Sequence, residues 1–119
     1  MLKEKIQGFI EKMMAVEGVA GCALISRDGI MLGRSLPGEC NEPWLAAMSA
    51  TLFASAESAS SILKLPLPEG VTISAEDSTL QVIGAGEKLL VVIVIRRGAE
   101  RALVPERLQA LVKEIGGAF

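Results

Sequence analysis

One long segment of this sequence is almost free of charge, and it constrains the fold more than any other. From Pro43 to Leu63 the chain carries a single charged residue, Glu57. Pro43 fits the first turn of a helix, where its missing N–H costs nothing, and Pro66 and Pro68 enforce the end of the helix. A surface helix would show a charged face. This helix is therefore expected to be covered on more than one side.

The same segment has about the length of a membrane span, which needs roughly 20 apolar residues. Its composition argues against a span, because six serine or threonine residues and six alanines leave it only weakly hydrophobic. We therefore expect no insertion into a membrane.

The two sides of this helix differ in side-chain size when residues are projected at about 100° each. One stripe is bulky and is expected to pack on the chain's own sheet: Trp44, Leu45, Met48, Leu52, Ala59, Ile62 and Leu63. The other side is smooth, would let another helix approach closely, and is the predicted dimer interface: Ala46, Ala47, Ala50, Phe53, Ala54, Glu57, Ser58 and Ser61. The alternative is that the smooth side simply faces water, although exposed helix faces normally carry Lys and Glu.

An edge strand is predicted to complete that interface. The run Val71–Ala75 alternates apolar and polar residues, as a half-buried strand does. It contains no Lys, Arg or Pro, the residues that keep a sheet edge from pairing with another chain. A two-fold dimer would bury the strand and the smooth helix side together. The strand residues expected in the interface are Val71, Thr72, Ile73 and Ser74.

The first third of the chain predicts a helix and a hairpin. Residues 2–16 have apolar side chains at helical spacing, and Gly18 follows as a stop. Two apolar runs, Val19–Ser26 and Ile30–Arg34, flank Arg27-Asp28-Gly29. Asp-Gly between such runs predicts a tight type I′ turn, which needs positive φ.

The last third predicts two more strands and a helix. A turn at Glu76–Ser78 precedes a strand over Thr79–Gly84. The β-branched run Leu89–Ile95 has the composition of a central strand buried on both faces, ended by Arg96, Arg97 and Gly98. Pro105 and Glu106 open a final helix, and Gly116-Gly117 is its expected stop.

Together these elements predict one domain over residues 1–119. Their order is α-β-β-α-β-β-β-α, and the economical arrangement is an α/β fold of the α+β kind. In it, one five-stranded antiparallel sheet is sandwiched by helices.

The charge balance argues against nucleic acid as a partner. Twelve basic residues are scattered among 14 acidic ones, for a net charge of −2. Phosphate backbones are held by clustered Lys and Arg, and the one basic cluster is Arg96, Arg97 and Arg101.

The sequence offers little to an enzyme. It has no histidine and no tyrosine, which removes the commonest general base and metal ligand. Adjacent Glu76 and Asp77 would point to opposite faces of a strand and are interpreted as a turn. Gly84–Lys88 lacks the spacing of a phosphate-binding loop and is interpreted as a hairpin turn. We therefore predict no catalysis, no cofactor and no metal.

The two cysteines lie in different settings. Cys22 is inside an apolar run and Cys40 is in a polar stretch. We expect two free thiols, with a disulfide as the alternative. The charged N-terminus lacks a signal-peptide apolar block, so the expected compartment is the cytoplasm.

At this point the sequence resembles the roadblock/dynein light chain family, in its compact prokaryotic single-domain form. The resemblance lies in the order of elements, in Val16-Glu-Gly-Val-Ala-Gly-Cys-Ala-Leu-Ile-Ser-Arg-Asp-Gly-Ile30, and in the Ala/Ser-rich helix after Trp44. It covers nearly the whole chain, whereas profilin-like domains share only the architecture.

The resemblance implies a homodimer with antiparallel long helices and third strands that join two sheets into one. It also implies a non-catalytic scaffold or regulator of a Ras-like small GTPase. The alternative is a structural adaptor subunit of a larger complex without a GTPase. A third function, the sensing of a small ligand in a profilin-like cavity, is not supported by any group of polar residues in the sequence.

Overall fold

The described part of the chain forms three helices and five strands. The computed structural model describes residues 1–97 and 104–119, so Gly98 and Arg101 lie outside the described residues. The elements are α1 (Leu2–Met14), β1 (Val19–Ser26), β2 (Met31–Ser35), α2 (Glu42–Ile62), β3 (Gly70–Ser74), β4 (Ser78–Ala85), β5 (Leu89–Arg96) and α3 (Val104–Ala118). Their order is the predicted one.

The five strands make one antiparallel sheet, as predicted. The strand order is β2-β1-β5-β4-β3, so β5 is central. Every β5 residue from Leu89 to Ile95 is buried except the half-buried Val94. A β-branched run of this kind stabilises a strand that is covered on both sides.

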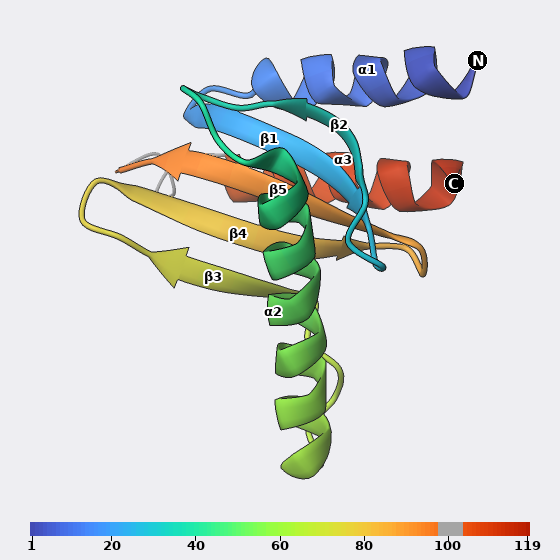
Figure 1. Ribbon diagram of the computed structural model, residues 1–119, viewed down its shortest axis with the longest axis vertical. Coiled ribbons are helices and arrows are strands. Elements are labelled where there is room, and N and C mark those ends of the chain that lie inside the picture. The colour runs from blue at the N-terminus through green and yellow to red at the C-terminus, as the bar shows by residue number, and fades with distance from the viewer. Residues whose placement is uncertain (98–103) are drawn as a thin grey trace.

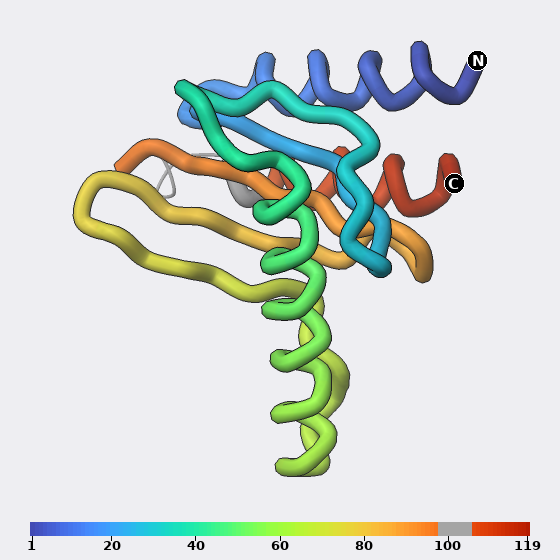
Figure 2. Tube along the Cα trace, viewed as in Figure 1, coloured from blue at the N-terminus to red at the C-terminus, as the bar shows by residue number. Residues whose placement is uncertain are grey.

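Helices cover the two faces of the sheet unequally. Figures 1 and 2 show α1 and α3 along one face and α2 across the other. The face under α1 and α3 holds the larger core, which includes Ile10, Met13, Leu24, Ile93, Leu108 and Ile115. The core under α2 is smaller and consists of Ala23, Ile25, Ala46, Phe53, Val82, Leu90 and Val92. Among the described helices, none has the length and apolar composition to cross a membrane.

The β1–β2 hairpin forms where it was predicted, but its turn is of another type. Gly29 has a φ of 90°, whereas Asp28 does not have a positive φ. The N–H of Gly29 donates to the Ser26 carbonyl (3.0 Å), and the N–H of Ser26 donates to the Ile30 carbonyl (2.9 Å). This is a three-residue loop in which only the last residue is left-handed, the pattern of a type I turn followed by a glycine bulge. The prediction of a type I′ turn is therefore wrong.

The C-terminal glycines do not stop α3, because the helix continues to Ala118. Gly116 lies against the β4–β5 turn, and a Cβ built on it would be 2.6 Å from the backbone nitrogen of Gly86. The glycine at this position is needed for a close approach of helix and turn, whereas a Cβ on Gly117 would meet nothing within 4 Å.

These two neighbours give a matched test. Gly116→Ala is expected to lower the free energy of unfolding by about 1–3 kcal/mol, because the backbones must move apart to relieve overpacking. Gly117→Ala is expected to raise it by up to ~1 kcal/mol through helix propensity. Urea denaturation of both variants measures the difference, and equal effects would contradict the close approach.

Candidate protein-interaction surface

The second half of α2 extends beyond the sheet. Figures 1 and 2 show α2 crossing the sheet from the β2 side and projecting past the edge strand β3. Asn41 caps its start, because the Asn41 side-chain oxygen accepts a hydrogen bond from the N–H of Trp44 (3.1 Å). Phe53 is the last buried residue of the helix. The part beyond Phe53 therefore has little of its own chain to rest on.

The two sides of α2 are not arranged as predicted. Its buried residues are Ala46, Ser49 and Phe53, and two of them, Ala46 and Phe53, belong to the predicted smooth side. The bulky residues are largely free: Trp44 is 65%, Met48 52%, Ile62 80% and Leu63 70% exposed. Small side chains allow close packing of a helix on any surface, and here that surface is the chain's own sheet. A Cβ on Gly29, for example, would lie 3.2 Å from the Cα of Ala47.

The structure separates the residues of the predicted interface. On α2, Ala46 and Phe53 are buried in the chain's own core, Ala50 and Glu57 are half-buried, and Ala47, Ala54, Ser58 and Ser61 are exposed. On β3, Val71 is half-buried, and Thr72, Ile73 and Ser74 are exposed. Ala46 and Phe53 are therefore unavailable to a partner, whereas the other residues of the predicted interface are at least partly accessible.

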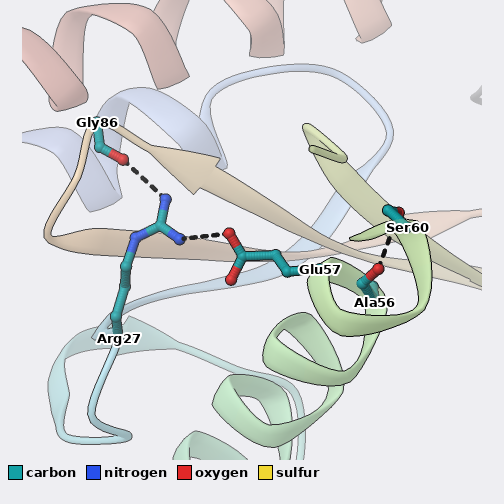
Figure 3. Close-up of polar contacts among 5 residues, drawn as sticks. All are labelled: Arg27, Ala56, Glu57, Ser60 and Gly86. Atoms are coloured by element: carbon teal, nitrogen blue, oxygen red, sulfur yellow. Dashed lines mark hydrogen bonds and ion pairs between the residues drawn. The ribbon is translucent and has the colours of Figure 1, made fainter. Parts of the chain in front are cut away.

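The exposed side of α2 carries no charge. Glu57, its one charged residue after the first turn, lies on the sheet side with Oε2 3.7 Å from Nη1 of Arg27 (Figure 3). Two hydroxyl groups are satisfied within the helix. Thr51 donates to the Ala47 carbonyl (2.9 Å), and Ser60 donates to the Ala56 carbonyl (2.9 Å; Figure 3). An uncharged exposed surface of this extent is typical of an interaction site.

One stripe of exposed and half-buried residues has the spacing of a helix-pairing seam. Its residues recur at intervals of three and four, and we call them the α2 flank: Leu45, Met48, Leu52, Ser55, Ala59 and Ile62. Leu52 packs partly against the core under α2, as do Val71 of β3 and Leu80 of β4. The sequence signal was the bulky stripe itself, which was interpreted as core.

Beside the flank, part of the sheet is left open. Ile73, Leu80 and Val94 lie in one row across β3, β4 and β5, on the face that α2 crosses. Leu80 and Val94 are half-buried and Ile73 is 44% exposed. In the described part of the chain, β3 pairs only with β4. Apolar side chains are thus accessible on the flank and in the open row, and the unpaired edge of β3 borders that row.

A groove of about 950 Å³ opens where β3 begins. Its walls come from α2, β3, β4 and α3 and include Phe53, Glu57, Val71, Ile83 and Val112. Within residues 1–97 and 104–119, no group of three or more Cys, Asp or Glu side chains lies close enough to hold a metal ion. The groove lies beside the accessible apolar side chains, and such an arrangement has the features of a binding surface.

The two cysteines are free, as predicted, with Cys22 buried and Cys40 exposed. Burial raises the pKa of the Cys22 thiol from its ordinary 9.0 to about 11. Since the thiolate is the reactive form, a thiol reagent at pH 8 is expected to modify one cysteine per native chain and both after denaturation. Cys40→Ser should remove the native reaction, and two equally fast thiols would contradict the burial of Cys22.

Known proteins resemble this chain in sequence and in fold. The sequence profile of the Roadblock/LC7 domain matches residues 5–94. An uncharacterized protein of Methanocaldococcus jannaschii is 29% identical over 93 residues, which are 78% of this chain and 79% of that protein. A structure of MglB with tetrameric arrangement and the gliding protein MglB of Thermus thermophilus each have a TM-score of 0.85 at 21% identity, covering 97% of this chain and 88% of theirs. Myxococcus xanthus MglB has a TM-score of 0.89 at 14% identity, covering 98% and 89%. At these identities the structures establish a shared fold.

Proposed function

Because this chain belongs to the Roadblock/LC7 family, we propose that it is a non-catalytic, dimeric scaffold or regulator that binds a Ras-like small GTPase. A regulator or adaptor role fits the family and its gliding-protein neighbours. The observation that supports the proposal is the uncharged α2 flank, whose second half projects past the sheet edge.

The first partner is a second copy of the chain. Two α2 flanks placed antiparallel bring each large side chain opposite a smaller or complementary one: Leu45 opposite Ile62, Met48 opposite Ala59, and Leu52 opposite Ser55. Packing of large against small residues gives close interhelical contact. The tetrameric arrangement of one MglB structure supports self-association in this fold.

The same two-fold axis would join the sheets. If it passes beside β3, the two β3 edges pair through Val71, Thr72, Ile73 and Ser74. The second half of each α2 then lies over the partner's open row rather than in water (Figure 1). One two-fold rotation would cover both the α2 flank and the β3 edge, and each patch would contact its own copy, as in an isologous interface. In this proposed dimer the α2 flank forms the helix part of the interface, in place of the smooth side predicted from the sequence.

The second partner is proposed to be a GTPase. A dimer of this kind presents two α2 helices and a joined sheet as a rigid platform, and the protein itself has neither a phosphate-binding loop nor a histidine. Any effect on nucleotide hydrolysis would come from how the platform positions the partner. With two free cysteines and such a partner, we place the protein in the cytoplasm.

Binding of a purified Ras-like GTPase tests this function. The GTPase is immobilised once with GDP and once with a non-hydrolysable GTP analogue, and the dimer is passed over both. We expect saturable binding that differs between the two nucleotide states. A dimer that binds neither state would contradict the GTPase proposal and favour the structural adaptor. Calorimetry with GTP and Mg²⁺ on the isolated protein should detect no binding.

A further inference from the structure

Arg27 connects three parts of the fold at the point where α2 leaves the sheet. Its Nη2 donates a hydrogen bond to the Gly86 carbonyl (2.8 Å) in the β4–β5 turn, and its Nη1 lies 3.7 Å from Oε2 of Glu57 (Figure 3). Its guanidinium carbon lies 5.1 Å from the centroid of the Phe53 ring. Phe53 and Glu57 are one turn apart on α2, so Arg27 contacts the helix at two successive turns.

From this arrangement we propose that Arg27 is a positioning residue: it sets the direction of the second half of α2 and thereby the alignment of the pairing flank. The inference rests on the proposed dimer. Beyond Glu57, the residues Ser58, Ala59, Ser61 and Ile62 are exposed and only Ser60 is half-buried. The contacts of Arg27 thus lie where the helix passes from buried to mostly exposed residues.

Gly84 supplies independent support, because it leaves the space that this cluster occupies. A Cβ at Gly84 would lie 3.0 Å from Nη2 of Arg27 and 3.2 Å from Cζ of Phe53. The β4 strand has extended backbone here, so the glycine is not required for a turn. It makes room for a guanidinium stacked on a ring.

Energy alone does not account for the cluster. The side chains of Arg27 and Glu57 are 30% and 33% exposed and their closest atoms are 3.7 Å apart, so the ion pair adds little stability. The Nε of Arg27 is buried without a hydrogen-bond acceptor among the described residues, which offsets part of the gain. What the planar guanidinium contributes is geometry, because it can stack on one group and bond two others at once.

Hydrogen exchange and dimer affinity test this role together. Arg27→Met is expected to raise amide exchange over residues 54–62 of α2 by about tenfold and to raise the dimer dissociation constant by a similar factor. Arg27→Lys should behave like Arg27→Met, since an ammonium group cannot make all three contacts. Glu57→Gln removes only the charge and should act in the same direction with a smaller effect.

Arg34→Met is the matched control. Arg34 pairs with Glu42 in the first turn of the same helix, at the end opposite to residues 54–62. Arg34→Met should change the amide exchange rates of residues 54–62 and the dimer dissociation constant by less than about twofold.

The exchange measurement is repeated on a monomeric background, Ala59→Arg. If the wild-type chain does not form a dimer, the proposed dimer is wrong. The amide exchange rates of residues 54–62 in the Arg27→Met variant still test the role of Arg27, because they do not depend on pairing. Unchanged exchange there, or an equal effect of Arg34→Met, would overturn the inference.

Discussion

An arginine in place of Ala59 is expected to turn the dimer into a monomer. Ala59 is exposed in the single chain and lies in the middle of the second half of the α2 flank, opposite the partner's Met48 in the proposed pairing. The substitution would bury an unpaired charge on each side of the two-fold axis, which costs several kcal/mol per charge. A loss of about 3 kcal/mol alone raises the dissociation constant roughly 100-fold. Sedimentation velocity over a range of concentrations measures the change.

Ala54→Arg is the control for this experiment. Ala54 is also exposed and also in the second half of α2, but at about 100° per residue it lies roughly 140° around the helix from Ala59. We expect this variant to remain a dimer. Dissociation of Ala54→Arg with retention of the Ala59→Arg dimer would restore the smooth side as the interface.

The second large effect is expected at Phe53, whose removal should destabilise the single chain. Phe53 is 3% exposed and fills the core between α2 and the sheet with Val82 and Val92. Truncation of a buried phenylalanine to alanine costs about 3–5 kcal/mol through lost burial and the cavity left behind. Urea denaturation of Phe53→Ala on the monomeric Ala59→Arg background measures the loss without a contribution from pairing.

Ile62→Ala separates the two roles of α2 residues. Ile62 is 80% exposed, so on the same monomeric background the substitution should change the free energy of unfolding by less than about 0.5 kcal/mol. In the otherwise wild-type chain, it should weaken the dimer. Equal losses for Phe53→Ala and Ile62→Ala in the monomer would contradict the assignment of the buried side.

The strands and the hairpin could be predicted because their signals are local. A run such as Leu89–Ile95 can only be satisfied in the middle of a sheet, and Asp28-Gly29 between two apolar runs specifies a reversal. The type of turn was harder, since Gly29 supplies positive φ in both alternatives and the conformation of Asp28 depends on loop length. The same holds for Gly116, whose role depends on a turn 30 positions earlier in the chain.

The buried and exposed sides of α2 could not be assigned from the sequence because the residues on both sides are suited to packing. Small residues such as Ala46 allow close packing on the chain's own sheet or on another helix, and bulky residues such as Met48 suit either a core or an interface. The charge of Glu57 did not separate the sides, since its partner Arg27 is 30 residues away in sequence. Only the three-dimensional contacts show that α2 leaves the sheet after Phe53 and that its bulky stripe is free.

Both functions considered for this protein, the GTPase regulator and the structural adaptor, require the chain to pair. Sedimentation equilibrium of the wild-type protein at micromolar concentration is the most direct measurement of that requirement. The account predicts about twice the chain mass of 12.5 kDa, falling to the chain mass in Ala59→Arg. A wild-type protein that stays at 12.5 kDa at these concentrations would contradict it.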